Sequence, residues 1–323
     1  MNAMIVKFAT CVFAALFLCY CPNAGTSVAA KYAGDPFQLG VGARAVGMGG
    51  AHSAAVNDVT AGFWNPAGLS SIPNRQVIFM HSETFGLLLN HDYIAFASPL
   101  RSQSGSAVGA ISLTRLGGGG IKLTEWDYKF NRPRVVKESG HADYQVIFSY
   151  AAGSSSRFRF GGSAKILYRN IADNSAYGIG ADLGVQCELG ANMTAALMVR
   201  DASTTLLSYD TGTKESIYPT MVPGFSTRQT MGDFSIVATA DAEVRFENYR
   251  EAAQYWSGSI SADTHLGCEI GFRERAFGRI GSDIGRLTLG CGISVSSLEF
   301  DLAYMRQTDI DDSFRISLLY NMK

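Results

Sequence analysis

Apolar and polar residues alternate one for one along most of the chain that follows residue 74. From Phe234 to Phe246 every second residue is apolar, and the segments 157–169 and 177–189 repeat the pattern. Successive side chains of a β-strand point to opposite faces, so these segments are predicted to be strands with one apolar and one polar face. They are longer than the about 5 or 6 residues usual in soluble sheets and suit the about 9 to 11 that a membrane-crossing strand needs.

This pattern predicts an all-β fold, a transmembrane antiparallel β-barrel of about 14 strands with an N-terminal hatch segment. Strands can cross lipid only in a closed barrel, because open edges would leave backbone groups unpaired in hydrocarbon. We choose 14 because single-chain bacterial barrels usually take an even number, with 12 and 16 as alternatives. Candidate strands lie near 75–81, 90–98, 106–115, 121–128, 142–151, 157–169, 177–189, 192–202, 217–228, 233–246, 257–266, 268–276, 285–295 or 298–306, and 313–321.

Aromatic residues at both ends of the apolar faces support this interpretation. Ring side chains at strand ends, with small aliphatic residues between them, are typical of the two interfacial girdles of a membrane barrel. The pairs are Tyr144 and Tyr150, Phe158 and Tyr168, Phe234 and Phe246, and Phe314 and Tyr320. The alternative, a large soluble β-sandwich or propeller, would need shorter strands, more surface charge and an internal repeat period.

Composition and charge narrow the possible functions. Only 17% of the 323 residues are charged, against about 25% in an ordinary soluble domain. Lys plus Arg is 27 and Asp plus Glu is 28, so there is no basic excess to neutralise phosphates and nucleic acid is not an expected partner.

The first 30 residues have the pattern of a secretory signal peptide. Lys7 precedes the apolar run Phe8–Tyr20, and the segment ends on Val28-Ala29-Ala30, small residues of the kind that signal peptidase accepts. We therefore predict three parts: residues 1–30 as signal peptide, 31–74 as N-terminal hatch segment and 75–323 as barrel. An uncleaved anchor is the alternative for the first part.

The segment 31–74 is rich in small residues and lacks the alternation of the strands. Asn57 or Asp58 can cap a short helix that Pro66 terminates. A barrel with more than about eight strands has a lumen that its own side chains do not fill, so a small-residue segment ahead of it is suited to act as a plug.

Two stretches of this segment carry a family resemblance. Gly42-Ala-Arg-Ala-Val-Gly-Met-Gly-Gly-Ala51, followed by Asp58 and Trp64-Asn-Pro-Ala-Gly-Leu69, resemble the N-terminal signature of the PorV/PorQ-like outer-membrane proteins. These belong to the FadL-like superfamily of 14-stranded barrels, whose hatch carries a comparable Asn-Pro-Ala element. Carried onto this chain, the resemblance implies hatch or ligand-path residues at Gly42, Arg44, Gly47, Met48, Gly49, Gly50, Asp58, Trp64, Asn65, Pro66, Ala67, Gly68 and Leu69.

The resemblance implies a protein of the Gram-negative outer membrane whose partners are outer-membrane lipid and small hydrophobic molecules taken up past the hatch. The alternative is a component of type IX secretion that binds exported proteins, as in the PorV branch, with secretion-system proteins as partners. A hydrophobic cavity beside the hatch would favour transport, whereas wide extracellular loops that dock a folded protein would favour secretion.

No constellation in the sequence indicates an enzyme, a cofactor or a metal. The five histidines are scattered without zinc-ligand spacing. Neighbouring strand residues point to opposite faces, so His81-Ser82-Glu83 is not expected to form a catalytic relay. Charges of both signs occupy the predicted lumen face, and their balance indicates salt bridges that brace the wall and hatch: Arg159, Lys165, Arg169, Asp182, Glu188, Asp241, Glu243, Arg245, Glu269, Arg273, Arg286, Asp301 and Arg315.

Overall fold

The structure is a computed structural model that describes residues 28–29, 34–84, 88–100, 107–153, 157–307 and 312–322. Most of the predicted signal peptide therefore lies outside the described residues. Its two described residues form β1 (Val28–Ala29), which pairs in parallel with β10 (Lys214–Ile217).

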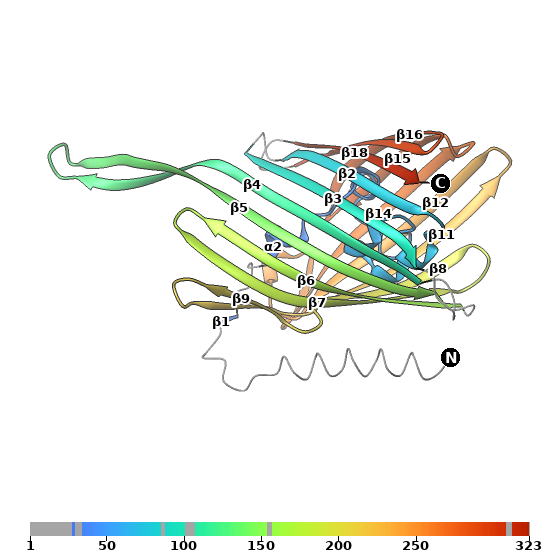
Figure 1. The fold of residues 1–323 in the computed structure, drawn as a ribbon, viewed down its shortest axis with the longest axis horizontal. Coiled ribbons are helices and arrows are strands. Elements are labelled where there is room, and N and C mark those ends of the chain that lie inside the picture. The colour runs from blue at the N-terminus through green and yellow to red at the C-terminus, as the bar shows by residue number, and fades with distance from the viewer. Residues whose placement is uncertain are drawn as a thin grey trace.

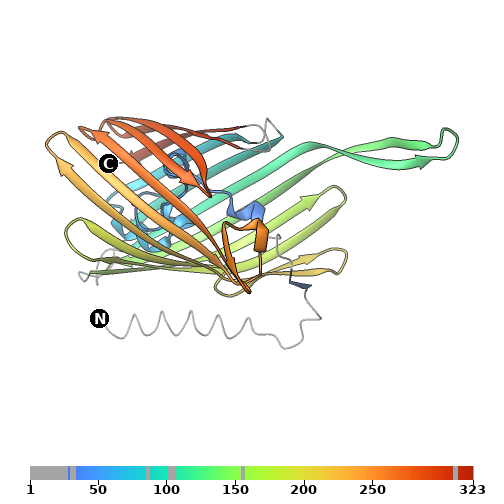
Figure 2. The same cartoon turned by 180° about the vertical axis from the view of Figure 1, so that it is seen from behind.

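Within these residues, 14 strands form a closed antiparallel barrel, as the alternation predicted. Each strand pairs with the next along the sheet, and the last pairs with the first through a register that includes Leu318 opposite Phe79. Figures 1 and 2 show the tilted wall from two sides. The wall strands are β2 (Arg75–Thr84), β3 (Leu89–Leu100), β4 (Ala107–Asp127), β5 (Arg132–Gly153), β6 (Phe158–Ile171), β7 (Asn174–Glu188), β8 (Met193–Arg200), β11 (Thr220–Met231), β12 (Phe234–Arg245), β14 (Ile260–Phe272), β15 (Ala276–Asp283), β16 (Arg286–Val295), β17 (Leu298–Met305) and β18 (Ser313–Met322).

Four of the predicted strands merge into two in the structure and two wall strands are added, although the total of 14 was correct. Residues 106–115 and 121–128 belong to the single strand β4, because Gly117 to Gly120 forms a register shift in the β4–β5 ladder and not a turn. Residues 257–266 and 268–276 are likewise mostly one strand, β14, and both 286–295 and 298–305 are strands. The strand missing from the prediction is β15 (Ala276–Asp283).

The faces of the strands follow the predicted register. On β12, Phe234 is 50% exposed on the outer face, whereas Thr239, Asp241 and Glu243 are buried on the lumen side. Aromatic rings pair across strands at both ends of the outer face, for example Phe234 with Phe272 and Tyr168 with Tyr177. This arrangement gives a lipid-facing band between two girdles. Two of the predicted lumen charges are exposed instead: Arg273 lies at a turn beside Asp233, and Glu188 lies at the end of β7.

The wall is interrupted where β8 ends. The chain turns at Asp201, which has a left-handed φ of 53°, and then forms a hairpin of β9 (Thr205–Tyr209) and β10. The C-terminal half of β7 pairs with β8, and its N-terminal half pairs with β9. The short strand β13 (Tyr255–Ser257) and the 3-10 helix η2 (Arg250–Ala252) lie between β12 and β14.

The two ends of the barrel differ in their connections. We call the end where β2 begins and β18 ends the near end, and its turns are as short as Gly232-Asp233 and Ser296-Ser297. At the opposite, far end, the hairpin of β4 and β5 extends well beyond the other strands (Figure 1). No helix in the described part of the chain is both long and apolar enough to cross a membrane.

Residues 34–74, which we call the lumenal segment, lie inside the barrel (Figure 2). They form four short helical pieces: α2 (Asp35–Gln38), α3 (Ala43–Gly47), α4 (Ala61–Trp64) and the 3-10 helix η1 (Pro66–Ser71). The main apolar core of the protein is made between this segment and the inner faces of β2 to β5 and β18, where Ile78, Tyr93 and Ile147 are buried.

Candidate functional site

The local sequence explains where the helices of the lumenal segment stop and start. Helix α4 ends at Trp64, one residue before the Asn65-Pro66 step, and Pro66 begins η1, where its fixed φ suits a first helical position. The predicted cap is close but not correct, because the N-cap of α4 is Thr60. Asp58 instead accepts hydrogen bonds from the backbone N–H and the hydroxyl of Thr60, at 2.8 and 2.5 Å.

Asn65 and Pro66 rest on a pair of glycines in the barrel wall. Gly161 of β6 and Gly184 of β7 lie opposite each other in the ladder. A Cβ added at Gly161 would lie 2.3 Å from the carbonyl carbon of Pro66, and one at Gly184 would lie 2.1 Å from Asn65 Oδ1. Only glycine therefore lets the wall approach the segment this closely.

The side chain of Asn65 completes this contact by hydrogen bonding. Its Nδ2 donates to the carbonyl oxygens of Ser53, at 3.1 Å, and Val185, at 3.3 Å, and its Oδ1 accepts from the N–H of Ala67 at 3.1 Å. The amide thus joins two parts of the lumenal segment to β7. Ala67 and Leu69 are fully buried beside it.

The glycine-rich residues 47–50 of the lumenal segment contact the barrel wall on the other side of the lumen. Gly267 of β14 and Gly281 of β15 are paired, and a Cβ at Gly281 would lie 2.3 Å from the amide nitrogen of Gly49. Gly49 itself has a left-handed φ of 67°. The carbonyl oxygen of Gly47 accepts a hydrogen bond from Thr288 Oγ1 at 3.2 Å, so the backbone of this turn is held directly by the wall.

Arg44 projects from α3 into a buried group of carboxylates. Its Nε and Nη2 each donate to Glu269 at 2.9 Å, and its Nη1 donates to Asn57 Oδ1 at 2.8 Å. Asp58 Oδ2 lies 3.7 Å from the same guanidinium. Burial alone would lower the pKa of Arg44, but the carboxylates of Glu269 and Asp58 raise it above its ordinary value, so the side chain stays charged. Because Arg279 also donates to Glu269, at 2.7 Å, the network joins the lumenal segment to two wall strands.

Asp241 makes a contact that sequence reasoning did not assign. Its carboxylate accepts hydrogen bonds from the N–H groups of His52 and Ser53, both at 2.8 Å, and from the Ser53 hydroxyl at 2.9 Å. Gln186 Nε2 donates to the Ser53 carbonyl at 2.9 Å. Nothing near Ser53 in the sequence signals these partners, since both lie more than a hundred residues further along the chain.

The predicted site residues form one body inside the barrel with two contact regions. Those from Gly42 to Gly50 lie against β14 to β18 and the adjoining β2, and those from Trp64 to Leu69 lie against β4 to β7. Within the first region, Gly42 donates its N–H to Met80 Sδ at 3.0 Å. Trp64 joins the two regions, because its indole N–H donates to the Val41 carbonyl at 2.9 Å.

A cavity of about 410 Å³ lies between the lumenal segment and the walls at the far end of the barrel. The lumenal segment contributes Leu39, Val46 and Trp64 to its lining, and the wall contributes many charged groups. Most of these charges are paired: Arg200 with Glu243 at 3.1 Å, Arg245 with Asp263 at 2.6 Å, Arg286 with Asp283 at 2.9 Å and His265 with Asp283 at 3.0 Å.

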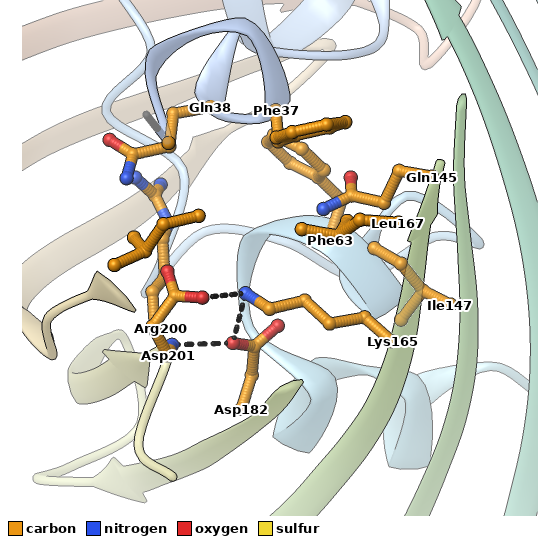
Figure 3. A pocket seen from close by; sticks show the side chains of 12 residues that line it. Phe37, Gln38, Phe63, Gln145, Ile147, Lys165, Leu167, Asp182, Arg200 and Asp201 are labelled. Atoms are coloured by element: carbon orange, nitrogen blue, oxygen red, sulfur yellow. Dashed lines mark hydrogen bonds and ion pairs between the residues drawn. The ribbon is translucent and has the colours of Figure 1, made fainter. Parts of the chain in front are cut away.

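A second, much smaller cavity of about 20 Å³ lies under α2 (Figure 3). Lys165 reaches across it and pairs with Asp182 at 2.8 Å and with Asp201 at 2.7 Å. The N–H of Asp201 donates to Asp182 at 2.7 Å, and Thr205 donates its hydroxyl to Asp201. This cluster fixes the interruption of the wall between β8 and β9. The volume suffices for about one water, so we assign the cluster a structural role.

The geometry of this site is suited to binding a molecule. Within the described residues, no group of His, Cys, Asp or Glu is arranged to hold a metal ion. The inward charges act mainly as the predicted salt bridges, as Lys165, Arg245, Glu269 and Asp301 show. The site offers a cavity, a segment that closes one side of it, and wall contacts that hold the segment in place.

The sequence matches no family model and no curated protein. The structure is similar to the toluene transporter TbuX of Ralstonia pickettii, with a TM-score of 0.58 at 13% identity over 88% of this chain and 99% of that one. It is also similar to CymD, a monoaromatic hydrocarbon channel (0.58, 11% identity, 88% and 98%), and to a FadL homologue from Pseudomonas aeruginosa (0.51, 12% identity, 84% and 96%). At these identities the likeness shows the fold, and this chain has the 14-stranded fold of the FadL-like channels.

Proposed function

We propose that this protein is an outer-membrane channel that carries small hydrophobic molecules past the lumenal segment, which acts as a hatch. The observation that carries the proposal is the cavity of about 410 Å³ that the lumenal segment closes on one side. Ligand pockets usually measure about 300 to 1,000 Å³. Support also comes from the fold, which resembles that of a toluene transporter and a monoaromatic hydrocarbon channel.

The connections at the two ends give the proposed orientation. Outer-membrane barrels have short periplasmic turns and longer extracellular loops. Two-residue turns occur at both ends, at 232–233 and 296–297 on the near end and at 172–173 and 284–285 on the far end. Among the described connections the β4–β5 hairpin at the far end is the long one, so we propose that the near end faces the periplasm. The cavity then lies on the outer side of the hatch, where a molecule from the medium arrives first.

Uptake of toluene tests the transport proposal directly. Cells that lack hydrocarbon channels and produce this protein should take up labelled toluene faster than cells that produce an unrelated barrel. Leu39→Asp places a charge in the cavity lining and should slow this uptake, whereas Thr213→Asp, on an exposed far-end turn, should not. Equal uptake with and without the protein would refute the proposal.

Deletion of Gly34 to Leu69 tests the hatch. The lumen of a 14-stranded barrel without its plug should fill with water, so the shortened protein should conduct ions in planar bilayers while the intact protein stays largely closed. A shortened barrel that inserts and folds but conducts no better than the intact protein would show that the segment is not a hatch.

We keep the secretion role as the alternative expectation from the PorV/PorQ resemblance. The similar structures named above are channels and a transporter, so they offer this alternative no support. It rests on the N-terminal signature alone.

A further inference from the structure

Arg315 is the one arginine of the cavity lining for which the described residues provide no ion pair. It extends inward from β18 and is only 4% exposed. Its Nη1 donates to the carbonyl oxygen of Gly40 in the lumenal segment. Its Nε has no hydrogen-bond partner among the described residues. A buried guanidinium without a counter-ion is unusual, because burial of an unpaired charge is costly.

The planar geometry of the Arg315 guanidinium limits which kind of anion could pair with it. Arginine carries five N–H donors in a planar fork and binds a carboxylate through two parallel hydrogen bonds. Since Nη1 is already used by Gly40, the edge formed by Nε and Nη2 is the one left for a carboxylate, and Nε on that edge is buried without a hydrogen-bond partner among the described residues. The missing partner is therefore an anion with two adjacent oxygens.

The rest of the cavity lining limits the size of the apolar group to which this anion is attached. Apolar groups come from Leu39, Val46 and Trp64 on the lumenal segment, and the rest of the lining adds Val222, Tyr249, Ala252, Ile284 and Met305. The paired charges described above surround these apolar groups. A long alkyl chain would have to pack against those charges and remove them from water, which costs free energy. The apolar part of the lining thus suits one ring or a short chain.

We infer that the cavity binds a small organic acid, a molecule with one carboxylate and a ring-sized or short apolar body, whose carboxylate pairs with Arg315. This inference rests on the proposed function and specifies its substrate class. The lumenal segment supplies the contacts to the apolar body, and β18 supplies the counter-ion. A neutral hydrocarbon of the same size would leave Arg315 without its partner.

Binding of benzoate, compared with neutral benzamide, tests the inference. Trp64 lines the cavity, so its emission reports binding once the exposed Trp126 and Trp256 are replaced by phenylalanine. A charge-assisted pair of hydrogen bonds should make benzoate bind at least about tenfold tighter than benzamide. Arg315→Gln should abolish that preference. The matched control Arg286→Gln, which removes a paired arginine from the same lining, should keep it.

The outcomes separate this inference from the proposed function. Equal binding of benzoate and benzamide by the parent protein would overturn the inference, and so would a preference lost equally in both arginine variants. Toluene uptake by the same proteins is measured separately, and its absence would overturn the proposed function whether or not benzoate binds. If Arg315→Gln does not fold, Arg315→Lys, which keeps the charge but not the two parallel donors, should show a reduced preference; an unchanged preference would overturn the inference.

Discussion

Alanine at Gly161 is the sharpest test of how the lumenal segment is held. The added Cβ would lie 2.3 Å from the carbonyl carbon of Pro66 and 2.4 Å from the amide nitrogen of Ala67. Both are backbone atoms, so no side-chain rotation can relieve the contact. Carbon atoms pack at about 3.5 to 4.0 Å, and the segment must therefore withdraw from β6 by about 1 Å.

The cost of this withdrawal can be worked from the contacts it disturbs. The hydrogen bond from Asn65 Nδ2 to the Val185 carbonyl is already 3.3 Å long and would be lost, at about 1 kcal/mol. Overpacking of a tight contact adds about 1 to 3 kcal/mol. Gly161→Ala should therefore weaken docking of the segment by about 2 to 4 kcal/mol, or about 30- to 1,000-fold.

Hydrogen exchange measured by mass spectrometry checks this value, because it reports the free energy of local opening. Peptides that cover residues 50–70 should exchange faster in Gly161→Ala, while barrel peptides away from β6 stay unchanged. Gly162→Ala is the control, since its Cβ would meet Leu183 Cδ2 at 3.6 Å and the Asp182 carbonyl oxygen at 3.7 Å, both ordinary contact distances. If the two variants exchange alike, the glycine pair does not position the segment and the reasoning is refuted.

Three further predictions follow from the same contacts and from the register. Arg44→Ala should weaken docking of the segment by about 1 to 3 kcal/mol, because Glu269 keeps only one of its two buried arginine partners. Unchanged hydrogen exchange of residues 42–58 would contradict this. Ala240→Arg on the outer face of β12 should lower the free energy of unfolding in lipid by about 2 to 4 kcal/mol, and Thr239→Arg on the lumen side should lower it less; the reverse order in urea titrations would mean that the faces are inverted. Burial and the nearby Arg44 guanidinium hold the pKa of His52 down to about 4, from 6.5. Docking stability that is fully present above pH 6.5 should thus fall by up to about 3 kcal/mol as the pH drops toward 4, an effect that His52→Gln should remove from the exchange rates.

The barrel could be predicted from sequence because its main signal is local. Alternation with a period of two depends only on which face of a strand meets lipid, and β12 shows it without exception at Thr239, Asp241 and Glu243. The signal failed at β15, where the large Phe277 lies on the inward register and Gly278 on the outward one, so the apolar alternation is lost. It also failed at Gly117–Gly120, because a bulge and a turn have the same glycine-rich composition.

The sequence could indicate candidate site residues in the lumenal segment, but it could not indicate which wall residues contact them. The family resemblance named Arg44, Asn65 and their neighbours as candidates, but their wall partners are far away in the sequence. Glu269 lies 225 residues from Arg44, and Val185 lies 120 residues from Asn65. Which glycine of a strand meets the segment depends on the closed register of the barrel, which one sequence does not specify.

Asp241 and Arg315 differ from most of the other charged residues that point into the lumen. Among the described residues neither forms an ion pair, although most other inward charges do. Both hold the backbone of the lumenal segment instead: Asp241 accepts from the N–H groups of His52 and Ser53, and Arg315 donates to the carbonyl of Gly40. If a carboxylate pairs with Arg315, it acts on the side chain that holds Gly40, whereas a neutral ligand does not, so we expect the binding of an acid to be coupled to the position of the lumenal segment.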